Sequence, residues 1–140
     1  MAYKTKPECL SLMESAWNVS ATTPELHGVD FVLGRGIHAN TFGVIVEVPF
    51  KLDGAPGCAI NYSLVGVTQG LADAMMMRSV CLLNAPDGLW FVSLAKTSMH
   101  ALEIANPLDT WPTASHGRGG LVYRISRDAI TRLDALVSRH

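Results

Sequence analysis

Residues 115–120, "SHGRGG", combine the residue types that suit anion binding. Arg118 offers a forked guanidinium, His116 titrates near neutral pH, and Gly119 leaves its backbone N–H open to a ligand. Arg124, on the polar face of the strand predicted to follow, could converge with Arg118. This loop is the best ligand-binding candidate in the sequence, for a phosphate or a carboxylate. The simpler interpretation, which we favour, is that the glycines let the chain enter the sheet without Cβ clashes.

Ser93 and Lys96 have the S-x-x-K spacing, in which one helical turn brings a lysine amine beside a serine hydroxyl. Such a dyad can generate a nucleophile and makes both residues catalytic candidates, with His116 as a third. The enzyme families that use this dyad need further motifs, which the sequence lacks. We therefore favour a structural interpretation, in which Ser93 ends a buried strand and Lys96 begins a solvated helix.

His100 and Glu103 are three residues apart in a segment predicted to be helical, so they would share one helix face. This pair could supply two metal ligands, or a base with its orienting carboxylate. A structural metal site needs about four ligands, and no third or fourth is evident nearby. A polar helix face explains the pair as well, and the sequence assigns no cofactor.

Arg35 and His38 lie in the glycine-rich stretch 34–43, "GRGIHANTFG", which we expect to be irregular. The stretch has neither the P-loop spacing nor the G-x-G-x-x-G pattern, so no nucleotide-binding motif is present. Arg35 and His38 are candidate ligand contacts on a loop, and a plain surface loop is the favoured alternative.

Asp30 and Glu47 invite comparison with metal-dependent nucleases, which place acidic residues on neighbouring strands. A lysine usually completes that motif two residues after the second acid. Here Pro49 occupies the position, and Lys51 could replace the lysine only after a rearrangement. The sequence therefore offers half of the motif.

The charge is distributed unevenly along the chain, although the net charge is only −1. Residues 1–117 carry six Lys and Arg against ten Asp and Glu, whereas residues 118–140 carry five Arg against two Asp. The basic end could contact nucleic acid. The acidic remainder argues against it, so nucleic acid is a possible partner that we do not favour.

Met75, Met76 and Met77 follow one another in a predicted helix, so at least one of them points away from the core unless a partner covers it. Charged residues make up only 16% of the chain, below the average of about 25%. Both observations predict a homo-oligomer or a protein partner with an interface at these methionines. A buried central helix would explain the methionines equally well.

The length of 140 residues suits one domain, residues 1–140. Cys9, Cys58 and Cys81 are odd in number and have no metal-like spacing, which favours a reducing cytoplasmic location. We expect no signal peptide, since the first residues lack a continuous apolar run. No apolar stretch approaches the roughly 18 residues of a membrane span.

Hydrophobic periodicity and turn residues predict alternating helices and hairpins. The predicted helices are 6–17, 69–78 with Thr68 as N-cap, 96–105, and a closing helix that begins after Ser126. The predicted strands are 29–33, 44–50 paired with 58–66, 79–83 paired with 89–94, and 121–125, with a long loop over 106–120.

Consecutive hairpins with helices between them predict an α+β fold, with a mainly antiparallel sheet of about five strands and helices packed on it. The order helix, hairpin, helix, hairpin, strand, helix is similar to that of the profilin-like and roadblock families. The resemblance concerns topology alone and implies a small sheet sandwiched by helices.

Two classes of function remain open. The first is a small intracellular binding or regulatory module that self-associates or docks on a protein partner, because no complete catalytic constellation is present. The alternative is a hydrolase acting on a phosphate- or carboxylate-bearing substrate, or a nucleic-acid-directed protein that uses the arginine-rich C-terminal segment.

Overall fold

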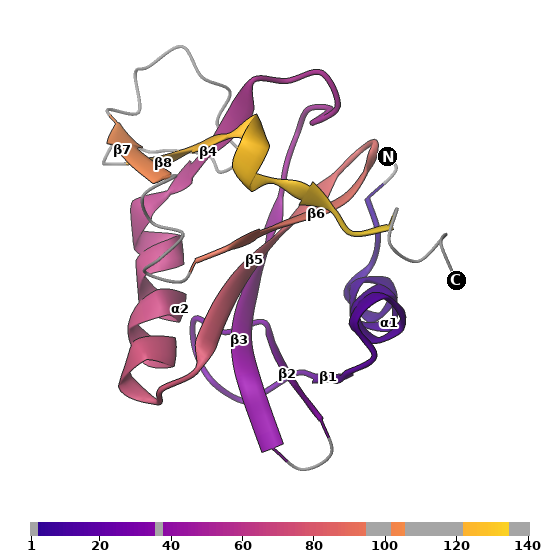
Figure 1. The fold of residues 1–140 in the computed structure, drawn as a ribbon, viewed down its shortest axis with the longest axis vertical. Helices are drawn as coiled ribbons and strands as arrows, with labels where there is room; N and C mark the ends of the chain where they lie inside the picture. Colours follow the sequence, from indigo (N-terminus) through magenta and orange to yellow (C-terminus); the bar gives the residue numbers. More distant parts are fainter. Residues whose placement is uncertain (1–2, 36–37, 95–101, 106–121, 135–140) are drawn as a thin grey trace.

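The computed structural model describes residues 3–35, 38–94, 102–105 and 122–134 (Figure 1). In chain order its elements are α1 (Lys6–Trp17), β1 (Ser20–Thr22), β2 (Phe31–Arg35), β3 (His38–Glu47), β4 (Gly57–Asn61), α2 (Tyr62–Ala74), β5 (Arg78–Ala85), β6 (Gly88–Ser93), β7 (Leu102–Ala105), β8 (Val122–Ser126), the short 3-10 helix η2 (Arg127–Ala129) and β9 (Thr131–Arg132).

The strands form two sheets. The larger has six strands in the order β1-β2-β3-β5-β6-β9, and the smaller has three in the order β4-β8-β7. The central pair β3 and β5 is parallel, whereas every other pairing is antiparallel. The predicted fold class is confirmed: the protein is α+β, with a mainly antiparallel sheet and helices packed on it.

The two helices cover opposite faces of the large sheet (Figure 1). Alternation along β3 makes this possible, because successive side chains point to opposite faces. Ile45 packs with α1 against Cys9 and Met13. On the other face, Val44 and Val46 join a cluster that reaches the small sheet and α2. β3 is therefore covered on both sides, as expected for a strand inside a parallel pair.

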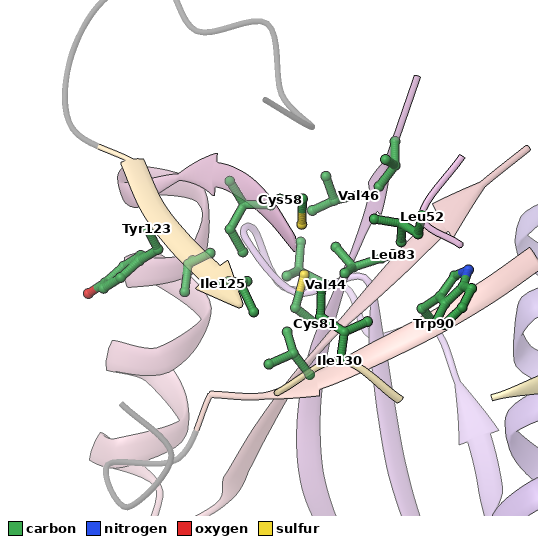
Figure 2. Close-up of a cluster of buried hydrophobic side chains, with 14 of the residues drawn as sticks. Val44, Val46, Leu52, Cys58, Cys81, Leu83, Trp90, Tyr123, Ile125 and Ile130 are labelled. Atoms are coloured by element: carbon green, nitrogen blue, oxygen red, sulfur yellow. The ribbon is translucent and has the colours of Figure 1, made fainter. Parts of the chain in front are cut away.

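The cluster that contains Val44 and Val46 joins the two sheets (Figure 2). Cys58 of β4 and Cys81 of β5 are both fully buried in it, together with Ile125 of β8 and Leu83 of β5. Burial raises the pKa of the Cys58 thiol to about 12. Both thiols are free and protonated at neutral pH, and they act as small apolar side chains.

Helix α1 has the predicted bounds because its start is encoded locally. Thr5 and Glu8 form a capping box: the Thr5 hydroxyl oxygen accepts from the Glu8 N–H, and the Glu8 carboxylate accepts from the Thr5 N–H at 3.1 Å. The Thr5 N–H and hydroxyl hold the pKa of the Glu8 carboxyl below its usual range. These bonds fix where the chain passes from the extended Thr5 into the helix.

The predicted hairpin of 44–50 with 58–66 is wrong. β3 pairs with β2 and β5, and β4 pairs with β8 in the other sheet. The alternation of apolar residues was correct, but a strand with one buried face fits many partners, and its pattern does not name them. The stretch 34–43 is likewise not irregular, since residues 38–43 lie in β3.

Helix α2 begins at Tyr62, earlier than predicted, so the end of the expected strand 58–66 is helical. Thr68 is consequently not an N-cap. It is buried within the helix, and its hydroxyl donates to the carbonyl oxygen of Gly28 at 2.6 Å. The helix ends at Ala74, and Met76 then adopts a left-handed conformation with φ 56°.

The C-terminal predictions were partly wrong. Leu102–Ala105 is a strand paired with β8, not the end of a helix, and residues 96–101 lie outside the described residues. After Ser126 the chain forms η2 and then β9, which pairs with β6. Ile130 and Leu133 are buried, so this irregular path places both side chains in the core, while residues 135–140 of the predicted closing helix lie outside the described residues. The order that resembles the profilin-like and roadblock families is therefore not the observed one.

The hairpin of β5 and β6 is confirmed with its short connection at Pro86–Asp87. The strands predicted at 29–33 and 121–125 are present as β2 and β8, each displaced by one or two residues. Within the part of the chain described here, no helix is both long and apolar enough to cross a membrane.

Candidate active site at the end of the parallel strand pair

A pocket of about 210 Å³ lies between the first turn of α1 and the carboxyl ends of β3 and β5. It is lined by Lys4, Lys6, Cys9, Asp30, Ile45, Glu47 and Asn84. The carboxyl ends of parallel strands are where open sheets commonly bind their ligands. The pocket is therefore in a favourable place, and it holds charged residues of both signs.

Asp30 is held in the pocket by two hydrogen bonds to β3. It directly precedes β2, and its N–H donates to the carbonyl oxygen of Gly43 at 2.8 Å. Its Oδ2 accepts from the N–H of Ile45 at 2.7 Å. The carboxylate is thus oriented by the backbone, while its second oxygen is not needed for that bond.

Glu47 comes from the neighbouring strand. It is the last residue of β3, and it lies two residues after Ile45, so both share the α1 face of the sheet. Its register partner on β5 is Asn84. Glu47 is exposed, and among the described residues its carboxylate has no hydrogen-bond or ion-pair partner. It is available to a ligand in the pocket.

The lysines enter from the N-terminal segment. Asn84 is 4% exposed, and its side-chain amide pairs with the backbone of Lys4. Its Nδ2 donates to the Lys4 carbonyl oxygen at 2.8 Å, and its Oδ1 accepts from the Lys4 N–H at 3.3 Å. The Tyr3 hydroxyl donates to the Val48 carbonyl oxygen at 2.9 Å. Lys6, two residues after Lys4, is the first residue of α1 and lines the same pocket.

The charged side chains of the pocket do not neutralise one another. The ion pairs seen among the described residues join Arg127 to Asp53 and Arg132 to Asp134, elsewhere in the fold. Two acids and two lysines therefore line one small pocket, and among the described residues no ion pair joins them. A ligand that carries both signs, such as a divalent cation with a phosphate, suits this arrangement.

The donor set suits Mg²⁺ better than a soft metal. Mg²⁺ commonly binds through one or two carboxylates and completes its shell with water and substrate phosphates. Asp30 and Glu47 supply such a pair. Burial raises the pKa of the Cys9 thiol, although Lys4 opposes the shift, so Cys9 is not a ready thiolate ligand. The described residues contain no group of three or more His, Cys, Asp or Glu that could cage an ion alone.

Apart from Asp30 and Glu47, the candidate residues that the structure describes lie away from this pocket. Ser93 is on β6, and Arg124 is on β8 opposite Glu103 of β7. Because Glu103 lies in a strand, the helix face that it was predicted to share with His100 does not exist. Arg35 and His38 are register partners where β2 ends and β3 begins, the opposite end of these strands from Asp30 and Glu47.

The remaining candidates are divided between the surface and the undescribed segments. Met75 and Met76 are 58% and 95% exposed, whereas Met77 is partly buried against Val29 and Phe42. Five candidates lie outside the described residues and stay predictions: Lys96, His100, His116, Arg118 and Gly119.

Sequence reasoning found the two acids and missed the rest of the pocket. Asp30 and Glu47 were singled out together because acids on neighbouring strands suggest metal chemistry. Lys4 and Asn84 are 80 positions apart, and nothing in the local pattern joins them. One signal was available, because Asn84 interrupts the apolar run "VCLLNA", and a polar residue in a buried strand needs a partner.

The sequence matches no protein-family model and no curated protein. The fold is similar to the solved structure of Archaeoglobus fulgidus Hjc, described as a Holliday junction resolvase from an archaeal hyperthermophile. The match has a TM-score of 0.50 at 14% sequence identity, and it covers 90% of this chain and 96% of that chain. At this identity the likeness concerns the fold alone.

Proposed function

We propose that the protein is a nucleic-acid-directed hydrolase that cleaves phosphodiester bonds in the pocket of Asp30 and Glu47. The observation that carries the proposal is the meeting of these two acids with Lys4 and Lys6 at the ends of β3 and β5. The fold likeness to a resolvase supports nucleic acid as the substrate class. Our sequence-based expectation that nucleic acid is a disfavoured partner is accordingly not supported.

Each part of the pocket has a role in such a reaction. Asp30 and Glu47 would hold a divalent cation, which supplies Lewis-acid activation of the phosphate and a water of lowered pKa. The positive charges of Lys4 and Lys6 would bind and orient the negatively charged phosphate. Asp30 keeps its orientation during the reaction because its Oδ2 is bonded to the Ile45 N–H.

The experiment is a cleavage assay on end-labelled DNA presented as a four-way junction, a linear duplex and a single strand. We expect products in Mg²⁺ and none in excess chelator. We also expect binding that weakens steeply as salt is raised, because phosphate contacts release counterions. Folded protein that neither binds nor cleaves any of these substrates would overturn the proposal. The most rapidly cut substrate identifies the preferred nucleic-acid structure.

A protein-binding role is a second candidate, favoured by the exposed apolar side chains around α2. Val67 is 46% exposed and Leu26 is 38% exposed, in addition to Met75 and Met76. The Thr68 hydroxyl bond to the Gly28 carbonyl holds the loop that contains Leu26 against α2 beside Val67. Such a surface suits association with a second copy or a protein partner, as predicted from the methionines. This surface lies on and beside α2, across the sheet from α1 and the pocket, so the two roles are compatible.

A further inference from the structure

The proposed reaction needs a cation beside Glu47, and strand β3 does not provide one. The position two residues after Glu47 is Pro49. Lys51 is exposed and does not line the pocket, so it does not fill the gap. Phosphodiester cleavage gathers negative charge on the phosphate oxygens, and a preorganised cation stabilises that charge. The cation must therefore come from another element.

Lys4 lines the pocket, and its backbone is fixed beside the end of β3. Both backbone polar groups of Lys4, its N–H and its C=O, are hydrogen-bonded to the side chain of Asn84. Asn84 is in turn the register partner of Glu47, and its carbonyl oxygen accepts from the Val48 N–H at 2.8 Å. Asn84 thus sets the position of the Lys4 backbone relative to the end of β3.

An asparagine suits this task better than other residues. Its amide has one acceptor and one donor group side by side, which match the N–H and C=O of a peptide. The side chain is nearly fully buried, so losing either bond would leave a buried polar group unsatisfied. The Tyr3 hydroxyl bond to the carbonyl oxygen of Val48, the residue after β3, attaches the same segment at a second point.

We propose that Lys4 supplies the catalytic cation that β3 lacks, and that Asn84 is the positioning residue that holds it there. This inference rests on the proposed function. Lys4 acts on the phosphate, whereas Asn84 acts through Lys4. The active site is then completed by a segment that precedes α1, across 80 positions of sequence.

The test compares Lys4→Ala, Lys4→Arg, Asn84→Ala and the double variant Lys4→Ala/Asn84→Ala with the wild type. We expect Lys4→Ala to lower the single-turnover cleavage rate by about 10²-fold, as for loss of one transition-state donor. Lys4→Arg should recover part of the rate because it restores the charge. Asn84→Ala should slow the wild type and have almost no effect in the Lys4→Ala background. Lys51→Ala serves as the charge-matched control.

A second readout does not depend on turnover. DNA binding in chelator is measured against salt, and Lys4→Ala should reduce the slope of log affinity against log salt by about one. Should Asn84→Ala fail to fold, Asn84→Asp replaces it, since that variant keeps the acceptor for the Lys4 N–H and loses the donor. Melting temperatures of all variants separate loss of fold from loss of cleavage.

The possible failures are distinguishable. The proposed function fails if the wild type does not cleave, or if Asp30→Asn cleaves as well as the wild type. In either case, a salt dependence of DNA binding that is unchanged in Lys4→Ala overturns the role of Lys4 as well. If Asp30→Asn is inactive while Lys4→Ala is as active as the wild type, only the inference about Lys4 fails. If Asn84→Ala slows the Lys4→Ala variant further, the role of Asn84 is structural.

Discussion

Changing either pocket carboxylate to its amide is expected to lower the rate of metal-dependent cleavage by at least about 100-fold while the protein stays folded. The changes are Asp30→Asn and Glu47→Gln. Each removes one negative charge from a site that is proposed to hold a divalent cation with two carboxylates, and the described part of the chain groups no third acid with them. The measurement is single-turnover cleavage of the preferred DNA substrate.

The amide variants are chosen to preserve the fold. Asn at position 30 can still accept the Ile45 N–H through its side-chain oxygen, so we expect a small change in melting temperature. Asp30→Ala, in contrast, leaves that N–H without its partner and should destabilise the protein by about 1 kcal/mol or more. Glu25→Gln is the matched control, since Glu25 is exposed and outside the pocket. Equal losses in all of the amide variants would contradict a local role.

A methyl group at position 43 is expected to destabilise the protein by about 3 kcal/mol. Gly43 on β3 is the register partner of Phe31 on β2, and the Phe31 ring lies over it. A Cβ there would lie 1.9 Å from the ring Cζ of Phe31, which is itself fully buried. Gly43→Ala would displace the ring and, through the bond from the Asp30 N–H to the Gly43 carbonyl, also the pocket. Urea denaturation measures the loss.

A compensating substitution tests the cause. The three ring atoms nearest the added Cβ are Cζ, Cε1 and Cε2, and leucine has none of them. In a double-mutant cycle, Phe31→Leu/Gly43→Ala should lose less stability than the two single changes added together. Additive losses, or a Gly43→Ala protein as stable as the wild type, would show that the ring does not occupy this space.

Elements with local signals could be predicted from the sequence. Helix α1 was predicted with its observed bounds from Pro7, Glu8 and the helical spacing of its apolar residues, and the structure adds the capping box of Thr5 and Glu8. The β5–β6 hairpin was found because "NAPDG" is a turn between two apolar runs. Such features depend only on neighbours in the chain.

Strand partners and the complete site could not be predicted in this way. β3 and β4 both alternate correctly, but the choice between pairing with each other and joining separate sheets depends on β5 and β8, which come later in the chain. The pocket illustrates the same limit. Asp30 and Glu47 were associated because both suggested metal binding, whereas Lys4 meets them only through Asn84, a contact that exists in the folded state alone.

The central claim is that Asp30 and Glu47 together hold a divalent cation beside Lys4. The most direct measurement replaces Mg²⁺ by Fe²⁺ and, with ascorbate and peroxide, maps where radicals from the bound ion cut the polypeptide. We predict cuts next to residues 30 and 47 that excess Mg²⁺ suppresses and that vanish in the Asp30→Asn/Glu47→Gln protein. Cuts that Mg²⁺ suppresses near His100 or His116 instead, or a pattern unchanged in the double variant, would contradict this claim.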